Sequence, residues 1–206
     1  MALLYKTVNP TRGVWKIEES VEEALSRLSD KAAHAEFLAR FTAEGRKREY
    51  LATRLLLREL LGEEASIAYR PSGAPFLPKH PLLYISISHT KGYAAISLDN
   101  RPTGIDIEYR SDRVRKIRDR FLSAEEETHI NPAHETAHLL IHWCAKETLF
   151  KLIDQEEVDF RIHLRVLPFP YSTEGELTVR EYRTPARREY TLAYQVTPEY
   201  VLTWRI

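Results

Sequence analysis

Two carboxylates stand on what the sequence indicates is one face of a strand. Asp106 and Glu108 alternate with Ile105 and Ile107, and alternation of this kind turns the acidic pair to one side and the apolar pair to the other. Like charges on a common face repel unless a cation lies between them. Magnesium takes carboxylate oxygens and keeps waters that can face phosphates. The alternative is a solvent-facing strand with two ordinary carboxylates.

A third carboxylate lies in a predicted helix, in the segment Trp143–Lys151. Glu147 and Lys151 are four residues apart, so they share a helix face. A surface ion pair commonly explains such spacing, and it contributes only about 0.3–0.5 kcal/mol. The helix is apolar over most of its circumference, however, so Lys146, Glu147 and Lys151 in its middle favour a functional site.

Other catalytic or metal-binding patterns are weak. His89 follows Ser88 at the end of a predicted strand, where a lone histidine is usually structural. Cys144 has no obvious partner histidine and is expected to be a buried thiol. Walker, dinucleotide-binding and nucleophile-elbow loops do not occur. Three histidines spaced by four residues lack the glutamate and fourth ligand of a zinc motif: His134, His138 and His142.

The composition narrows the class of protein. Thirty basic residues balance thirty acidic ones among 206, so no overall field attracts nucleic acid or membrane. The single cysteine fits a reducing compartment. No stretch approaches the roughly 20 apolar residues of a membrane helix, and the first residues lack a signal-peptide pattern. We therefore expect a cytoplasmic protein that binds neither nucleic acid nor membrane.

The elements that must position these residues are read from hydrophobic periodicity, turn residues and two capping-box patterns, Ser20 with Glu23 and Ser123 with Glu126. Helices are predicted at 20–28, 32–41, 46–61, 110–120 and 133–153. Strands are predicted at 3–8, 14–17, 67–69, 82–87, 93–98, 105–109, 158–166, 176–182, 189–196 and 200–204. The strands from 82 to 109 suggest an antiparallel meander.

Each half therefore combines helices with antiparallel strands, which is not the strand–helix alternation of a parallel sheet. We expect an α+β fold of two similar lobes, each a long helix packed on a small antiparallel sheet. The predicted lobes are residues 1–101 and 102–206. The predicted helix at 46–61 carries Arg46, Lys47, Arg48 and Arg54. This charge is either a solvated flank or a clamp for a phosphate group.

Three motifs occur in order along the chain: Ser88-His89, Gly104–Glu108 and Trp143–Lys151. Together they resemble the 4′-phosphopantetheinyl transferases, whose signature is G-x-D followed some forty residues later by W-x-x-K-E-x-x-x-K. Asp106 and Glu147 are 41 positions apart. The chain length is similar to that of the single-chain, surfactin-synthetase-activating type. That resemblance implies two lobes related by a pseudo-twofold axis, and a monomer.

The resemblance implies transfer of the phosphopantetheine arm of coenzyme A to a serine of an apo acyl or peptidyl carrier protein, as in fatty-acid, polyketide or nonribosomal-peptide synthesis. Magnesium, or manganese, would be held by Asp106, Glu108 and Glu147. The pyrophosphate would meet Lys151 and His89, with Ser88 nearby. The 3′-phosphate would meet Arg54, helped by Arg46, Lys47 and Arg48. The adenine would lie near Gly73, Ala74 and Pro75. The serine proton would go to Glu147 or Glu126.

One position departs from the family pattern. Members commonly have Gly-Lys-Pro where this chain has Gly-Ala-Pro, so one coenzyme A contact is missing at Ala74 unless Lys79 or Lys91 supplies it. Two other functions stay open at this point. The same carboxylates could serve a metal-dependent phosphohydrolase, and the chain could be a binding module for coenzyme A or a carrier protein without turnover.

Overall fold

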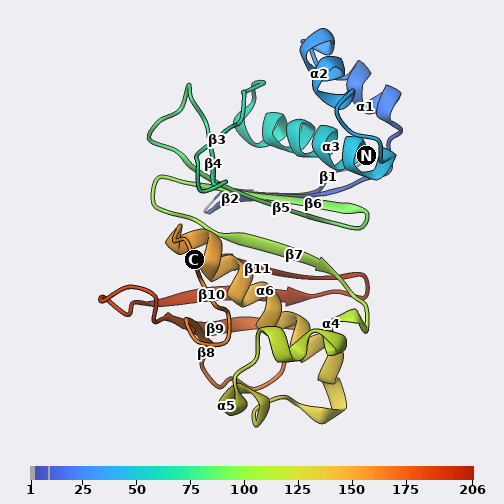
Figure 1. Cartoon of the computed structure of the whole chain (residues 1–206). Coiled ribbons are helices and arrows are strands. Elements are labelled where there is room, and N and C mark those ends of the chain that lie inside the picture. The colour runs from blue at the N-terminus through green and yellow to red at the C-terminus, as the bar shows by residue number, and fades with distance from the viewer. Residues whose placement is uncertain (1–2, 9) are drawn as a thin grey trace.

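The computed structural model describes residues 3–8 and 10–206. Its strands form two main sheets (Figure 1). The first sheet has the order β1 (Leu3–Val8), β2 (Thr11–Lys16), β6 (Tyr93–Asp99), β5 (Tyr84–Thr90). The second has the order β7 (Ile105–Tyr109), β11 (Tyr200–Arg205), β10 (Glu189–Val196), β9 (Glu174–Glu181), β8 (Leu164–Val166). A two-stranded ribbon joins β3 (Ala68–Tyr69) to β4 (Pro75–Phe76).

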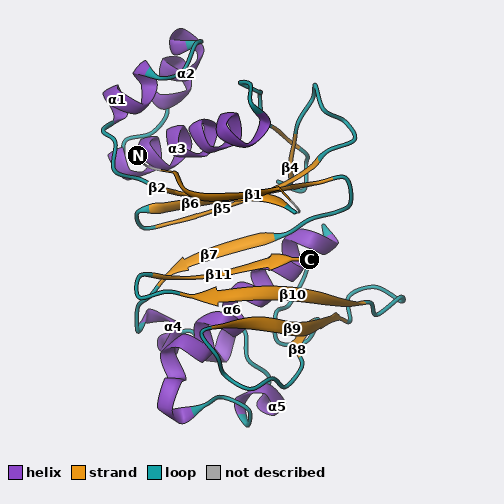
Figure 2. Ribbon diagram, turned by 180° about the vertical axis from the view of Figure 1, so that it is seen from behind, coloured by secondary structure: helices purple, strands orange, loops and turns teal. Residues whose placement is uncertain are grey.

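The helices cover the two sheets separately, as seen from the front and from behind (Figures 1 and 2). The first half contains α1 (Val21–Ser26), α2 (Lys31–Leu38) and α3 (Glu44–Leu61). The second half contains α4 (Arg113–Lys116), α5 (Ala124–Glu127), α6 (Glu135–Ile153) and two 3₁₀ turns at Arg118–Arg120 and Pro132–His134. The long helices α3 and α6 each lie across one sheet, so the α+β class is confirmed. In the described residues no helix has both the length and the apolar character needed to cross a bilayer.

The two sheets share a strand order. In the first sheet β2, which precedes α3, lies beside β6, and β6 lies beside β5. In the second sheet β7, which precedes α6, lies beside β11, and β11 lies beside β10. All strands of the first sheet end by Asp99, and all strands of the second begin at Ile105 or later. The pseudo-twofold relation and the division at residues 101 and 102 stay predictions.

Local sequence signals account for the ends of the helices. Ser20 caps α1 through a reciprocal capping box with Glu23, as predicted. Gly62 ends α3 in the left-handed conformation, with φ of 81°, which glycine adopts without strain. Asn131 and Pro132 open the turn that leads into α6.

The meander predicted over residues 82–109 is wrong at its third strand. β5 and β6 pair antiparallel, but β7 leaves this sheet and pairs antiparallel with β11. The run at 158–166 is also shorter as a strand, since only Leu164–Val166 pairs. Both errors concern partners distant in sequence, which local alternation does not specify.

Three apolar clusters hold the fold together. One surrounds α3 in the first half and one surrounds α6 in the second. A third joins the sheets, and it is built from Val14, Tyr93, Ala95, Ile105, Ile107, Tyr200 and Leu202. Because the isoleucines of β7 belong to this third cluster, the carboxylates of β7 point to its opposite face, toward α6. The interpretation of that face as solvent-exposed is wrong, since Asp106 is only 3% exposed.

Candidate active site

The centre of the site is the carboxylate of Asp106, on β7. Its Oδ1 accepts hydrogen bonds from Ser88 Oγ at 2.8 Å and from Lys151 Nζ at 2.7 Å. Its Oδ2 is buried and has no hydrogen-bond partner within the described chain. A buried carboxylate oxygen without a partner is costly, so this atom points to a ligand that the protein alone does not supply.

Two further carboxylates flank Asp106. Glu108 accepts from Trp143 Nε1 at 2.9 Å and from Thr90 Oγ1 at 3.2 Å. Burial, with a smaller contribution from Asp106, raises the pKa of Glu108 above its ordinary value. Burial and then the charge of Asp106 raise the pKa of Glu147, on α6, to about 7. The charge of Asp106 therefore disfavours the charged form of both glutamates.

The chemistry of this donor set fits a hard divalent cation, which takes carboxylate oxygens and relieves their repulsion. Asp106, Glu108 and Glu147 are the residues that would hold it. As the side chains stand, the described residues contain no ready group of three or more ligating His, Cys, Asp or Glu. Lys151 occupies the cationic position next to Asp106 instead. The surface ion pair suggested by the spacing of Glu147 and Lys151 is replaced by this contact.

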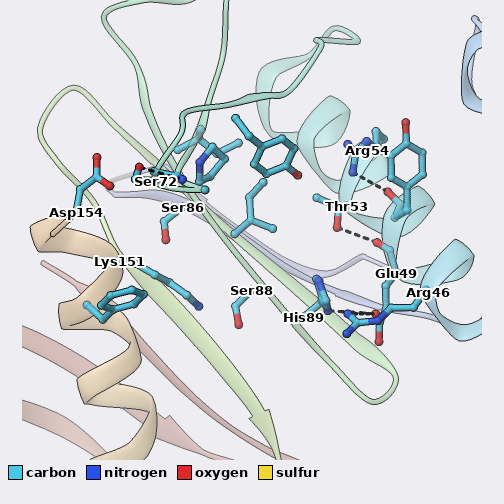
Figure 3. A pocket seen from close by; sticks show the side chains of 18 of the residues that line it. Arg46, Glu49, Thr53, Arg54, Ser72, Ser86, Ser88, His89, Lys151 and Asp154 are labelled. Atoms are coloured by element: carbon cyan, nitrogen blue, oxygen red, sulfur yellow. Dashed lines mark hydrogen bonds and ion pairs between the residues drawn. The ribbon is translucent and has the colours of Figure 1, made fainter. Parts of the chain in front are cut away.

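A cavity of about 650 Å³ is lined by Ser88 and Lys151, the two side chains that contact Asp106 (Figure 3). Its wall is formed by one face of α3, the loop 72–75, strand β5 and the end of α6, together with aromatic side chains from α2 and its following loop. The lining residues predicted from sequence are Arg46, Arg54, Gly73, Ala74, Pro75, Ser88, His89 and Lys151. No carboxylate of the acidic trio lines the cavity, but Ser88 and Lys151 do and both contact Asp106.

The cationic groups enter the cavity from opposite sides, as Figure 3 shows. Lys151 comes from α6, and its Nζ also donates to the carbonyl of Ile105 at 3.2 Å. Arg54 comes from α3, where its guanidinium lies 3.5 Å from the centroid of the Tyr50 ring. Its NH1 also donates to the Tyr50 carbonyl at 3.3 Å. The stacking and this bond hold the guanidinium in place, and an arginine fork suits phosphate oxygens.

Glu49 is a functional candidate that the sequence reasoning missed. Its Oε2 lies 3.2 Å from His89 Nδ1 and 3.2 Å from Arg46 NH1. Burial lowers the pKa of His89, and the Glu49 carboxylate partly offsets this. Glu49 therefore orients two predicted ligand contacts at once. Its three-residue spacing from Arg46 was the available signal, but nothing local connects it to a histidine forty residues later.

Several predicted residues are not brought to the cavity. Lys47 does not line it, and Arg48 instead donates to the carbonyls of Ile17 and Glu19. Neither lysine suggested as a substitute at Ala74 reaches it: Lys79 is not in the lining, and Lys91 Nζ lies 5.3 Å from the Tyr109 ring centroid.

Glu126 also lies away from the cavity, with 1% of its surface exposed. Its carboxylate accepts from the Ser123 amide and hydroxyl and from the amide of Val166. Its own amide donates to Ser123 Oγ, which completes the predicted capping box. Lys146, which is fully buried, donates to it at 2.8 Å. All its oxygens are engaged, so the structure does not place Glu126 as a base.

Two histidines of the predicted row, His138 and His142 on α6, are structural. His138 and His142 are buried against aromatic rings, and His142 Nδ1 donates to the His138 carbonyl at 2.9 Å. Burial lowers the pKa of His138 to about 4 and that of His142 to about 3. Both are therefore neutral at physiological pH.

Comparison with known proteins bears on the second half of the chain. A model of the 4′-phosphopantetheinyl transferase superfamily matches residues 102–204, which is 103 of the 206 residues. The chain belongs to this superfamily. A 4′-phosphopantetheinyl transferase of Bacillus subtilis is 29% identical over 89 residues, 42% of this chain. The chain thus matches only 40% of the length of that curated relative.

The superfamily match contains one part of the site and omits another. Asp106, Glu108, Glu147 and Lys151 lie inside residues 102–204. The cavity walls formed by α3, the loop 72–75 and β5 precede this range. Membership in the superfamily therefore rests on the carboxylate side, and the identity of the ligand in the cavity has to be argued from geometry.

Proposed function

We propose that this protein transfers the 4′-phosphopantetheine arm of coenzyme A to a serine hydroxyl of an apo carrier protein, and that the reaction depends on magnesium and releases adenosine 3′,5′-bisphosphate. One observation supports this above the others. Arg54, Arg46 and His89 line one wall of the cavity. Lys151 lines the other wall and contacts Asp106, the buried member of the acidic trio. A long anion with a terminal phosphate and an internal pyrophosphate fits such a sequence of charges.

The residues of the chain then have separate tasks. Arg54 and Arg46 bind the 3′-phosphate, while Gly73, Ala74 and Pro75 border the adenine. Lys151 and His89 bind the pyrophosphate.

Phosphoryl transfer asks a protein mainly for positioning and charge neutralisation. Asp106, Glu108 and Glu147 hold a divalent cation, magnesium or manganese, which when bound neutralises developing charge on the pyrophosphate. Of the two candidate bases, Glu147 is favoured over Glu126. Glu147 faces the other carboxylates of the site, whereas the oxygens of Glu126 are already engaged by the Ser123 and Val166 amides and by Lys146.

The finer assignments rest on the resemblance of the motifs. We propose the surfactin-synthetase-activating type, a monomer in the cytoplasm, with an acyl or peptidyl carrier domain as partner. The absent lysine at Ala74 predicts weaker coenzyme A binding rather than slower chemistry, since a cation at this position would contact the ligand and not the reacting phosphorus.

Mass measurement of a carrier separates the candidate functions. The protein is incubated with coenzyme A, magnesium chloride and an apo carrier protein, and the carrier is weighed. A gain of one phosphopantetheine supports transfer. Free phosphopantetheine without a modified carrier supports a phosphohydrolase and refutes the proposal. Neither product, with coenzyme A bound, supports a module without turnover and refutes it too.

Arg54→Ala tests the orientation of coenzyme A. Hydrogen bonds to a charged group contribute about 1.5–3 kcal/mol, so we expect KM for coenzyme A to rise about 10- to 100-fold with kcat changed little. The KM for 3′-dephospho-coenzyme A should not change. Arg40→Ala is the matched control, because that side chain is 67% exposed and does not line the cavity. Strong discrimination between the two ligands in Arg54→Ala would place the 3′-phosphate elsewhere.

A further inference from the structure

The two sheets meet along β5 and β7, and side-chain hydroxyls make the junction. These strands belong to different sheets, so no backbone ladder joins them in the described chain. Three amides of β7 instead donate to β5 hydroxyls: Ile105 to Ser86 at 3.1 Å, Ile107 to Ser88 at 3.2 Å and Tyr109 to Thr90 at 3.1 Å. Each acceptor precedes its donor by 19 residues, so the two strands run parallel in a fixed register.

Two of these hydroxyls also hold the carboxylates. Ser88 donates to Asp106 at 2.8 Å and Thr90 donates to Glu108 at 3.2 Å. A hydroxyl has one proton, so Ser88 cannot donate to a phosphate oxygen while it donates to Asp106. In this arrangement the hydroxyl proton of Ser88 is engaged by Asp106.

Each bridge is also a short hydrogen-bonded chain. The amide of Ile107 donates to Ser88, which donates to Asp106; the amide of Tyr109 donates to Thr90, which donates to Glu108. A hydroxyl that accepts one hydrogen bond becomes a better donor in the next. The backbone of β7 thus fixes its own carboxylates by way of the neighbouring sheet.

Ser86, the third hydroxyl of this row, supports no carboxylate. The corresponding position is Gly104, immediately before β7, where an added Cβ would lie 2.5 Å from the carbonyl oxygen of Thr148 on α6. No side chain fits there. Ser86 therefore joins the sheets without touching the acidic trio, which makes it an internal control for the other two.

We propose that Ser88 and Thr90 are positioning residues that hold Asp106 and Glu108 in place for a divalent cation, and that they tie this geometry to the strand that lines the cavity. The proposal rests on the proposed function, since it takes the acidic trio as the cation ligands. Thr90 gives the cleaner test because it does not line the cavity, whereas Ser88 does.

The experiment titrates the protein with magnesium chloride alone, without coenzyme A, and follows tryptophan fluorescence. Trp143 donates to Glu108, so its emission reports on that carboxylate. Thr90→Val keeps the shape and removes the hydroxyl, and we expect magnesium affinity to fall about 10- to 100-fold, as for other groups that orient metal ligands. Thr90→Ser keeps the hydroxyl and should bind as the wild type does.

Ser86→Ala removes a hydroxyl that joins the two sheets but contacts no carboxylate. It therefore separates the positioning of the carboxylates from the joining of the sheets. It should lose stability to urea by an amount similar to Thr90→Val, with unchanged magnesium affinity. The proposal is overturned if Thr90→Val binds magnesium as tightly as the wild type does. It is also overturned if Ser86→Ala loses as much magnesium affinity as Thr90→Val. A wild type that transfers phosphopantetheine while Thr90→Val binds magnesium normally refutes only this inference. If the wild type neither transfers phosphopantetheine nor changes its tryptophan fluorescence with magnesium, the proposed function is refuted along with this inference.

Discussion

The buried pair of Lys146 and Glu126 leads to a quantitative prediction about stability. Lys146 is fully buried and donates to the Phe121 carbonyl at 2.6 Å, to Glu126 at 2.8 Å and to the Phe160 carbonyl at 2.9 Å. Burial lowers the pKa of Lys146 to about 8 despite the adjacent carboxylate. Desolvation thus outweighs the attraction, and the pair is held by complete hydrogen bonding.

Lys146→Met keeps the length of the side chain but leaves a buried carboxylate and two carbonyls without their donor. Removing one partner of a buried pair costs about 3–5 kcal/mol. Glu126 keeps its bonds from the Ser123 and Val166 amides, which argues for the lower half of that range. A domain of this size loses about 2–4 °C in Tm per kcal/mol, so a loss of about 3–4 kcal/mol should lower Tm by about 6–16 °C.

Urea unfolding at pH 7 measures the loss directly, with Lys116→Met on the exposed surface of α4 as the control. The double variant Lys146→Met with Glu126→Gln removes the unpaired charge, so it should be more stable than Lys146→Met alone. A loss below about 1 kcal/mol in Lys146→Met would refute the reasoning, because a buried pair would then contribute no more than an exposed one. A double variant that is less stable than Lys146→Met alone would also refute the reasoning.

Two further predictions concern the same helix. Gly104→Ala should cost about 1–3 kcal/mol in urea unfolding, because its Cβ meets the Thr148 carbonyl, whereas Gly45→Ala, which has nothing within 4 Å, should not destabilise. Acid should also destabilise the fold. His138 and His142 are neutral when folded and have pKa values near 6.5 when unfolded, so the unfolded state binds more protons as pH falls below about 6.5. The two histidines should lower the unfolding free energy by about 2–4 kcal/mol between pH 7 and pH 5. Glu147 should offset part of this loss, because its pKa of about 7 lets the folded state take up a proton over the same interval. His142→Phe should therefore make the loss on acidification smaller, and an unchanged pH dependence would contradict the reasoning.

The sequence was informative where structure is decided locally. The strand Ile105–Tyr109 has the predicted bounds because alternation and the preceding turn define it. The capping box at Ser123 and Glu126 forms as predicted, since both residues lie within one turn. The end of α3 at Gly62 follows from a single backbone conformation that favours glycine.

Sequence reasoning failed where two distant segments decide the environment of a side chain. The adjacent residues Lys146 and Glu147 looked like one polar face, yet α6 sends Lys146 into the core and Glu147 toward the acidic trio. A rotation of about 100° per residue makes this separation inevitable, but which side is core depends on the sheet beneath. Glu126 lies away from the cavity for the same reason: the core around Lys146 decides its environment.

The hydroxyl junction also explains why the acidic residues lie where two sheets meet. β5 and β7 are edge strands of their sheets, and edge amides and carbonyls need partners. A direct ladder would bring the strands to about 4.8 Å and satisfy those groups with backbone alone. Bridging through hydroxyls leaves the Ile105 carbonyl available, and Lys151 takes it at 3.2 Å while contacting Asp106. The lysine at the proposed pyrophosphate site is thus anchored by a carbonyl that a continuous sheet would have used.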